Sequence, residues 1–173
     1  MQMDKLLSTQ RITLRSCRKS DLPILTSMWF DVENGKYLSD PTEEYVDDRY
    51  RAALEEIETR QGGYYLTVVL NDTKQIIGSC FIFPDGKRER FEIAYCIHKT
   101  YWRNGYAAEI LSLVTSWARD NGFIEITAEA AKENVASDSL LRKNGFSVTG
   151  ESRFKKYNMD IFYDSYTYSK ILR

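Results

Sequence analysis

Apolar and polar positions alternate in short segments of this chain, which is the pattern of half-buried β-strands. Residues 11–15, Arg-Ile-Thr-Leu-Arg, follow this pattern. Residues 64–70, 76–83 and 90–97 are rich in aromatic and β-branched residues, and turn-forming sequences separate them. Because strands joined by such short links pair in opposite directions, we expect these three to form an antiparallel meander.

Elsewhere apolar residues recur every three or four positions, which predicts helices. The first helix is predicted to begin at Ser20-Asp21-Leu22-Pro23, where a capping side chain precedes an early proline. A second is predicted to begin near Pro41, with its acidic residues outward. Its inward side chains are expected to be Tyr45, Tyr50, Ala53, Leu54 and Ile57.

The second half of the chain contains two helix-to-strand units with the same stop signal. Residues 105–120 and 134–143 have a helical period, and each segment is followed by Asn-Gly-Phe. Glycine just past a helix permits a positive φ, and the phenylalanine closes an apolar contact over the last turn. A strand is predicted after each stop, the first of them over 124–128, and residues 162–168 form a last β-prone run.

The resulting order, β-α-α-β-β-β-α-β-α-β-β, predicts an α/β (α+β) fold of three layers. We expect a mixed central sheet of about six to seven strands with helices on both faces. No linker or low-complexity segment divides the chain, and 173 residues is the length of one domain. A single domain over residues 1–173 is therefore expected.

Composition and charge exclude several classes of function. The 24 Lys and Arg residues nearly balance the 25 Asp and Glu residues, which argues against a nucleic-acid partner. No segment approaches the roughly 20 apolar residues of a membrane span, and no secretory signal is recognisable. The three cysteines show no C-x-x-C spacing, so neither a disulfide framework nor a metal site is expected. A cytoplasmic location fits this cysteine use best.

The segment 97–107 has the pattern of an anion-binding turn. A basic turn containing Gly105 leads into a helix N-terminus, where unpaired N–H groups and the helix dipole favour negative charge. Gly105 would let a phosphate approach the backbone, and Arg103 adds a positive charge. Asn-Gly is also a hairpin signal, but the period after Gly105 is helical. No G-x-x-x-x-G-K-[ST] motif or three-glycine dinucleotide fingerprint is present.

These elements together resemble the GNAT N-acetyltransferase superfamily, over essentially the whole chain. Trp102-Arg103-Asn104-Gly105-Tyr106-Ala107 is similar to its acetyl-CoA pyrophosphate loop, Gln/Arg-x-x-Gly-x-Gly/Ala, with Trp102 in the first place. Asn134-Val-Ala-Ser137 and the following 140–146 resemble a motif of the ribosomal-protein (RimJ/RimL-type) branch, as do the opening 9–15 and closing 163–168. The resemblance implies a GNAT-like fold and transfer of an acetyl group from acetyl-CoA to an amine by direct attack on the thioester.

The resemblance also implies which residues hold acetyl-CoA. Backbone donors of the loop would bind the pyrophosphate; these residues are Trp102, Arg103, Asn104, Gly105, Tyr106 and Ala107. The preceding strand, Tyr95-Cys96-Ile97, would be splayed and would offer free N–H groups to the pantetheine and the thioester oxygen. Preorganised donors of that kind are worth about 3 kcal/mol. No metal is implied.

Three side chains are candidates for the chemistry. Glu92 is the candidate general base, with a pKa raised by burial; a strand glutamate can equally pair with an arginine or face solvent. Asn134 is carried over as a pantetheine contact and Ser137 as the donor to the departing thiolate. Asn134 is also a plain helix N-cap and Ser137 a first-turn residue. Because many GNAT enzymes have a tyrosine where this chain has Leu141, the proton donor stays open.

Two further residues invite chemistry that we do not assign to them. His98 is the single histidine, so it is expected to be a loop residue at the edge of the cofactor cleft. Cys96 suggests an acyl-cysteine scheme, but a small buried apolar residue in a strand is the favoured interpretation.

The acceptor is open at this stage. In the fold that is implied, it lies between residues 31–58 and residues 154–163. Ten acidic residues against Lys36, Arg49 and Arg51 in the first segment favour a cationic amine, such as a protein N-terminus, a polyamine or an aminoglycoside. The basic segment 153–156 argues against a simple rule. Tyr37, Tyr157 and Tyr163 are candidates to line this cleft.

Alternatives to an active enzyme also remain. A non-catalytic acyl-CoA-binding or regulatory module of the same fold would keep the loop without turnover. A nucleotide-binding α/β domain is a more distant alternative. The oligomeric state is open, with a homodimer as one option.

Overall fold

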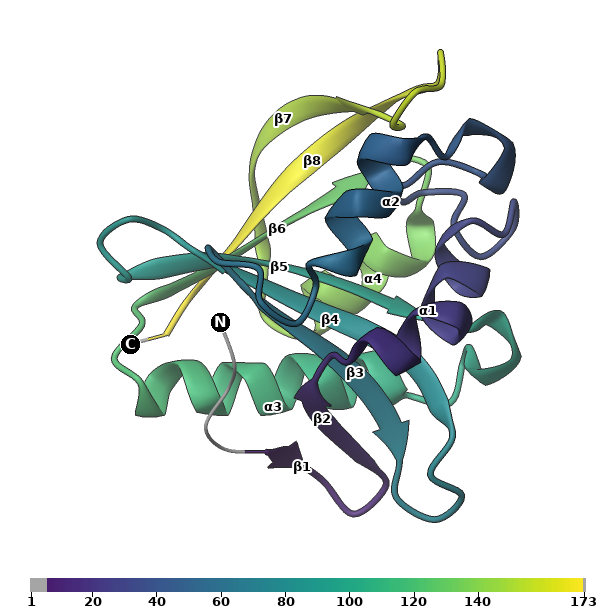
Figure 1. Cartoon of the computed structure of the whole chain (residues 1–173). Helices are drawn as coiled ribbons and strands as arrows, with labels where there is room; N and C mark the ends of the chain where they lie inside the picture. Colours follow the sequence, from purple (N-terminus) through teal and green to yellow (C-terminus); the bar gives the residue numbers. More distant parts are fainter. Residues whose placement is uncertain (1–5, 173) are drawn as a thin grey trace.

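The computed structural model describes residues 6–172 and is built on one mixed β-sheet (Figure 1). In chain order its strands are β1 (Leu7–Ser8), β2 (Ile12–Ser16), β3 (Tyr64–Leu70), β4 (Ile76–Pro84), β5 (Arg90–Ile97), β6 (Glu125–Ala131), β7 (Ser147–Lys155) and β8 (Phe162–Ile171). Across the sheet the order is β1-β2-β3-β4-β5-β6-β8-β7. Within the described chain β5 and β6 pair in parallel, and the other neighbours are antiparallel.

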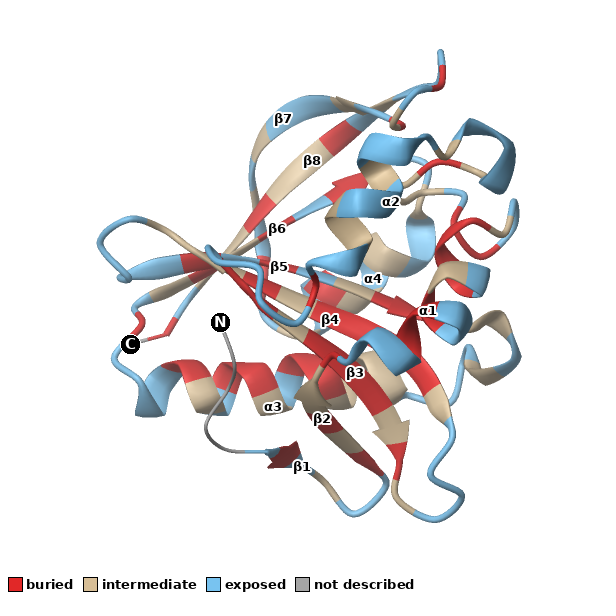
Figure 2. Cartoon of the chain, viewed as in Figure 1, coloured by how far each residue is buried: buried red, intermediate tan, exposed pale blue. Residues whose placement is uncertain are grey.

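Helices cover both faces of this sheet, which confirms the expected three layers. They are α1 (Leu22–Trp29), α2 (Asp48–Glu55), α3 (Tyr106–Asp120) and α4 (Val135–Lys143), with 3-10 turns at Lys19–Asp21, Glu43–Tyr45 and Lys99–Tyr101. Side chains of α3 and α4 share one apolar cluster with the sheet, and those of α1 and α2 share another. In Figure 2 the face of α3 toward the sheet is buried and the opposite face is exposed.

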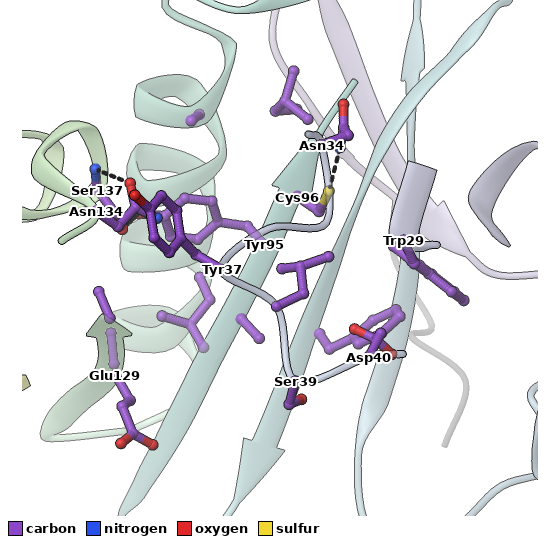
Figure 3. A pocket seen from close by; sticks show the side chains of 18 of the residues that line it. Trp29, Asn34, Tyr37, Ser39, Asp40, Tyr95, Cys96, Glu129, Asn134 and Ser137 are labelled. Atoms are coloured by element: carbon purple, nitrogen blue, oxygen red, sulfur yellow. Dashed lines mark hydrogen bonds between the residues drawn. The ribbon is translucent and has the colours of Figure 1, made fainter. Parts of the chain in front are cut away.

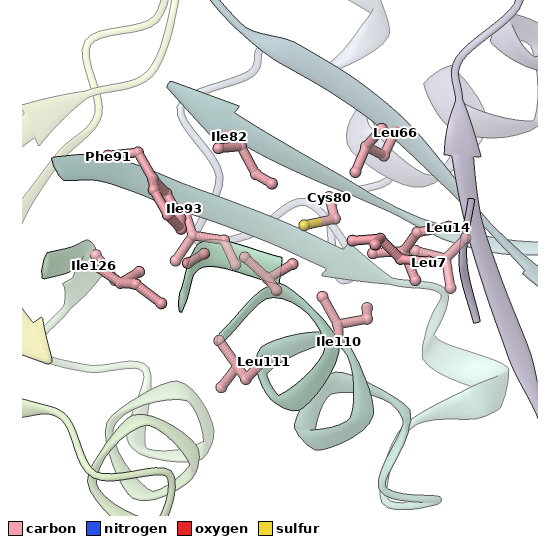
Figure 4. Packing of buried hydrophobic residues seen from close by; sticks show 14 of the residues in the cluster. Leu7, Leu14, Leu66, Cys80, Ile82, Phe91, Ile93, Ile110, Leu111 and Ile126 are labelled. Carbon is pink, nitrogen blue, oxygen red and sulfur yellow. The ribbon is translucent and has the colours of Figure 1, made fainter. Parts of the chain in front are cut away.

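The larger cluster is formed where α3 crosses the central strands. Ile110 and Leu111 of α3 are almost fully buried and point at Phe91 and Ile93 of β5 and at Cys80 of β4 (Figure 4). Fully burying such side chains is worth about 1.5–3 kcal/mol each. This packing fixes the N-terminus of α3 relative to the end of β5, and therefore positions the turn between them.

Two sequence-based expectations need correction. The sheet has eight strands rather than six or seven, because the two-residue β1 pairs with β2, placing Leu7 opposite Leu14. A strand this short has no alternation that a sequence can reveal. The second helix begins at Asp48 instead of near Pro41, because Asp47 caps it by accepting from the N–H of Tyr50. Tyr45 precedes it and is 42% exposed, not inward.

The predicted helix stops are confirmed. Gly122 and Gly145 have φ of +79° and +83°, in the left-handed region that glycine adopts without strain. Phe123 donates its backbone N–H to the carbonyl of Ala118, and both Phe123 and Phe146 are buried. Each stop returns the chain to the sheet within a few residues.

Candidate active site

Strands β5 and β6 separate after a short parallel pairing. In the described chain their ladder joins Arg90–Glu92 to Glu125–Thr127, after which β5 continues along β4 and β6 along β8. The backbone N–H of His98 bonds to Ile77 in β4, so by alternation Cys96 also bonds to β4 while Tyr95 and Ile97 turn their N–H groups toward the opening. Of the expected segment 95–97, these two residues therefore supply the free donors, and Cys96 does not.

This opening is part of a cleft of about 1380 Å³. The cleft extends from the N-terminus of α3, across β5, to the segment between α1 and α2 (Figure 3). Of the sequence-predicted site residues, it is lined by Glu92, Tyr95, Cys96, Ile97, Trp102, Arg103, Gly105, Tyr106, Ala107, Asn134 and Ser137. Asn104 is not among the lining residues of the described chain.

Carbonyl groups of the turn before α3 are held by side-chain donors. The Trp102 indole N–H donates to the Ile97 carbonyl at 2.7 Å. Asn104 Nδ2 donates to the carbonyls of Tyr101 and Trp102, at 3.2 and 3.0 Å. The carbonyl of Asn104 in turn accepts from Arg11 at 2.9 Å. Asn104 thus serves the turn by closing it, and the oxygens that would repel an anion are already occupied.

The N–H groups of the same turn are free for a ligand. Within residues 6–172 the backbone N–H groups of Arg103 and Gly105 have no hydrogen-bond partner. The i→i−4 bonds of α3 start only at Glu109, which bonds to the carbonyl of Gly105. Arg103 and Gly105 have φ of +62° and +82°, which curls the backbone into a concave nest of donors. Such a nest at a helix N-terminus binds phosphate.

On the α4 side of the opening, three predicted side chains are linked. Asn134 caps α4 by accepting from the N–H of Ser137 at 3.2 Å, and the hydroxyls of Ser137 and Tyr95 are 3.1 Å apart. Burial raises the pKa of Tyr95 to about 12, so its phenol stays protonated. Leu141 is fully buried. The phenol of Tyr95 is a polar group that sequence analysis did not consider.

Glu92 lies on the face of β5 opposite to Tyr95, in the same cleft. Partial burial in the cleft wall, and then the negative charge of Glu129 on β6, raise the pKa of Glu92. Within residues 6–172 no arginine forms an ion pair with Glu92, whereas the other part of that alternative holds, because the residue is exposed to solvent in the cleft. A carboxylate with a raised pKa facing a cleft is suited to taking a proton from an amine.

The far wall of the cleft is held by the turn between β7 and β8. Lys156 is 4% exposed, and its ammonium donates to the carbonyls of Gly35 and Leu38 at 2.8 and 2.7 Å. Tyr157 donates its backbone N–H to Ser39. Burial lowers the pKa of Lys156. Lys156, which belongs to the basic segment noted in the sequence, therefore has a structural role: it holds residues 35–38 against the turn between β7 and β8.

A third carboxylate, that of Asp40, lies near Lys156. It accepts from the hydroxyl of Tyr50, and burial raises its pKa. Tyr37 and Tyr157 line the cleft as anticipated, whereas Tyr163 packs edge-on against Tyr37 with ring centroids 5.5 Å apart. Asp40 has no recognisable signal in the local sequence, because its place in the cleft depends on contacts with distant residues.

The two residues set aside earlier have structural partners. His98 caps the Lys99–Tyr101 turn by accepting from the N–H of Thr100. The Cys96 sulfur accepts from Asn34 at 3.2 Å, and burial raises the pKa of this thiol to about 12. A thiol held in its neutral form is a poor nucleophile.

Neither a metal-binding group nor a membrane-spanning helix is found within residues 6–172. No group of three or more His, Cys, Asp or Glu side chains is arranged to hold a metal ion. None of the described helices is long and apolar enough to cross a membrane.

Comparisons with known proteins identify relatives of this chain. A family model for the acetyltransferase (GNAT) domain matches residues 11–147. The chain is also 30% identical over 175 residues to the uncharacterized N-acetyltransferase YoaA of Bacillus subtilis (strain 168), covering 96% of this chain and 97% of YoaA.

Solved structures share the fold at low sequence identity. An acetyltransferase from Salmonella typhimurium that modifies the N-terminal serine of ribosomal protein L7/L12 superposes with a TM-score of 0.79 at 15% identity, covering 98% of this chain and 100% of that one. Spermidine N-acetyltransferase from Vibrio cholerae, in complex with CoA and spermine, superposes with a TM-score of 0.78 at 16% identity, covering 95% and 97%.

Proposed function

The chain belongs to the GNAT acetyltransferase family, and from that premise we propose that it transfers the acetyl group of acetyl-CoA to the primary amine of a protein N-terminus or of a small cationic molecule. The amine attacks the thioester directly. The observation that carries the proposal is that one cleft joins a nest of free N–H donors, a splayed strand and a carboxylate with a raised pKa. Residues 1–173 are taken as one catalytic domain.

The fit to acetyl-CoA follows from which groups are free. The diphosphate needs several donors and no facing carbonyls, which is what the turn at Arg103–Gly105 offers. The pantetheine carries amides that pair with the backbone of β5 where β6 has left it. The N–H groups of Tyr95 and Ile97 are the candidate donors to the thioester oxygen.

Glu92 acts on the attacking amine and Ser137 on the departing thiolate. Glu92 takes one proton from the ammonium form of the acceptor. The amine nitrogen then forms a bond to the acetyl carbon, the carbon–sulfur bond breaks, and a second proton passes from the nitrogen to the departing thiolate, which leaves the amide and the CoA thiol. The hydroxyl of Ser137, oriented by Tyr95 at 3.1 Å, donates a hydrogen bond to the departing thiolate. Because the pKa of Tyr95 lies above that of an ordinary thiol, the phenol orients Ser137 and keeps its own proton.

We place the chain in the ribosomal-protein (RimJ/RimL-type) branch. The motif at Asn134–Ser137 and the absence of a tyrosine at Leu141 support this placement, as does the likeness in fold to the Salmonella enzyme. The likeness to the Vibrio spermidine enzyme supports a small cationic amine as well as a protein N-terminus. The cleft wall agrees with either acceptor, since Asp40, Glu92 and Glu129 all line it.

A binding test and a turnover test examine the proposal separately. Acetyl-CoA at 100 times its Kd should stabilise the protein by about 2.7 kcal/mol, seen as a rise in Tm, while ATP should not. A panel of N-terminal peptides, polyamines and aminoglycosides is then assayed by release of free thiol. Absence of any Tm shift with acetyl-CoA would disprove the proposal, and binding without turnover of any amine would reduce it to acyl-CoA binding.

A further inference from the structure

A contact between the N-terminal part of the chain and α3 lies directly behind the proposed diphosphate turn. Arg11 forms an ion pair with Glu109, in the first turn of α3, and Thr9 donates to the same carboxylate at 2.6 Å. The Arg11 guanidinium also lies over the ring of Tyr106, 4.5 Å from its centroid. The segment that contains Thr9 and Arg11 is thereby held against the start of α3, although about a hundred positions separate the two in the sequence.

The same guanidinium reaches the turn itself. Arg11 Nη2 donates to the carbonyl of Asn104 at 2.9 Å and would lie 3.5 Å from a Cβ placed on Gly105. Arg11 is not among the cleft-lining residues of the described chain, so it acts from the outer side of the turn. Its hydrogen bond keeps the Asn104 carbonyl directed away from the space that a diphosphate would enter.

The charge of Glu109 makes this cation necessary. A carboxylate in the first turn of a helix ordinarily interacts well with the helix dipole. At the N-terminus of α3, however, it competes with the diphosphate and repels it. The ion pair with Arg11 offsets the negative charge of Glu109, so that the N–H groups of the nest can still attract an anion.

We infer that Arg11 is a positioning residue for the diphosphate of acetyl-CoA, acting by turning the Asn104 carbonyl outward and by neutralising Glu109. The inference rests on the proposed function. A purely structural ion pair would lose its effect equally when either partner is replaced. Here, replacing Arg11 should weaken the binding of acetyl-CoA and replacing Glu109 should strengthen it.

Paired variants test this assignment. Arg11→Met keeps an unbranched side chain and removes the guanidinium with its charge; the Kd of acetyl-CoA should rise about three- to tenfold with kcat at saturation unchanged. Glu109→Gln keeps an oxygen that can accept from Arg11 and Thr9; the Kd should fall by up to about threefold. The double variant restores the wild-type balance of charge but not the hydrogen bond to the Asn104 carbonyl, so its Kd should lie between those of Arg11→Met and the wild-type protein.

Two controls separate charge from folding. S-acetylpantetheine lacks the diphosphate, so its KM should be the same in all four proteins, and Tm without ligand reports any loss of stability. Equal weakening in both single variants, no recovery in the double variant, or the same loss with S-acetylpantetheine would overturn the inference. Failure of the wild-type protein to bind acetyl-CoA would instead overturn the proposed function.

Discussion

Replacing Glu92 by glutamine tests the proposed base, because the amide keeps the size of the side chain and cannot take the proton. A general base contributes about 10²- to 10⁴-fold to a rate. The cleft wall desolvates the carboxyl group of Glu92 only in part and the residue is still reached by solvent, so water can accept the proton in its place. We therefore expect the lower end of that range, a loss of about 10²-fold in kcat/KM or about 2.7 kcal/mol.

The pH profile gives a second, independent signature. Burial first, and then Glu129, raise the pKa of Glu92. A base acts only when ionised, so wild-type kcat/KM should fall as the pH drops through this raised pKa. Glu129→Gln removes the like charge, lowers the pKa of Glu92 and should move the acidic limb to lower pH. Glu92→Gln should remove the limb.

The assay follows thiol release across pH with the best acceptor of the panel, and Tm shifts give the Kd of acetyl-CoA. The reasoning holds if Glu92→Gln keeps wild-type affinity while turnover falls. It is refuted if kcat/KM drops less than about threefold, or if the acidic limb persists in that variant.

Three other changes have definite outcomes. Gly105→Leu forces a side chain into the left-handed region at φ +82° and brings its Cβ to 3.5 Å from Arg11 Nη2, which should distort the nest so that acetyl-CoA no longer raises Tm; a normal shift would show that the ligand binds elsewhere. Lys156→Met leaves the Leu38 carbonyl without its donor and the Gly35 carbonyl with only the N–H of Leu38, which should cost about 1–3 kcal/mol in denaturant unfolding and raise the KM of the amine but not of acetyl-CoA; equal changes in both KM values would contradict it. Phe146→Ala should cost about 3–5 kcal/mol in the same unfolding assay, and a cost under about 1 kcal/mol would mean that the helix stop does not depend on this contact.

Local signals were sufficient for much of the fold. The meander, the two Asn-Gly-Phe stops and the turn before α3 each depend on residues close in sequence, where turn chemistry and helical period act directly. The three-layer arrangement followed because each predicted element has one apolar face to bury.

Long-range contacts were the part that sequence could not supply. In the sequence Lys156 is one of several neighbouring basic residues, and only its hydrogen bonds to the carbonyls of Gly35 and Leu38 show its structural role. The partnership of Arg11 with Glu109 joins two residues that each look like ordinary surface charges. The division of labour along β5, with Tyr95 giving an amide to the opening and Cys96 giving one to β4, depends on the register of the ladder.

Because β5 and β6 separate, a ligand can pair with the open edge of β5 where a neighbouring strand would otherwise lie. A partner bound through main-chain amides does not read the side chains that stand above and below them. The side chains that contact the amine acceptor can therefore vary while the main-chain binding of the thioester is kept. Evolution, or a protein engineer, can exchange one acceptor for another here without rebuilding the part of the enzyme that holds the acetyl donor.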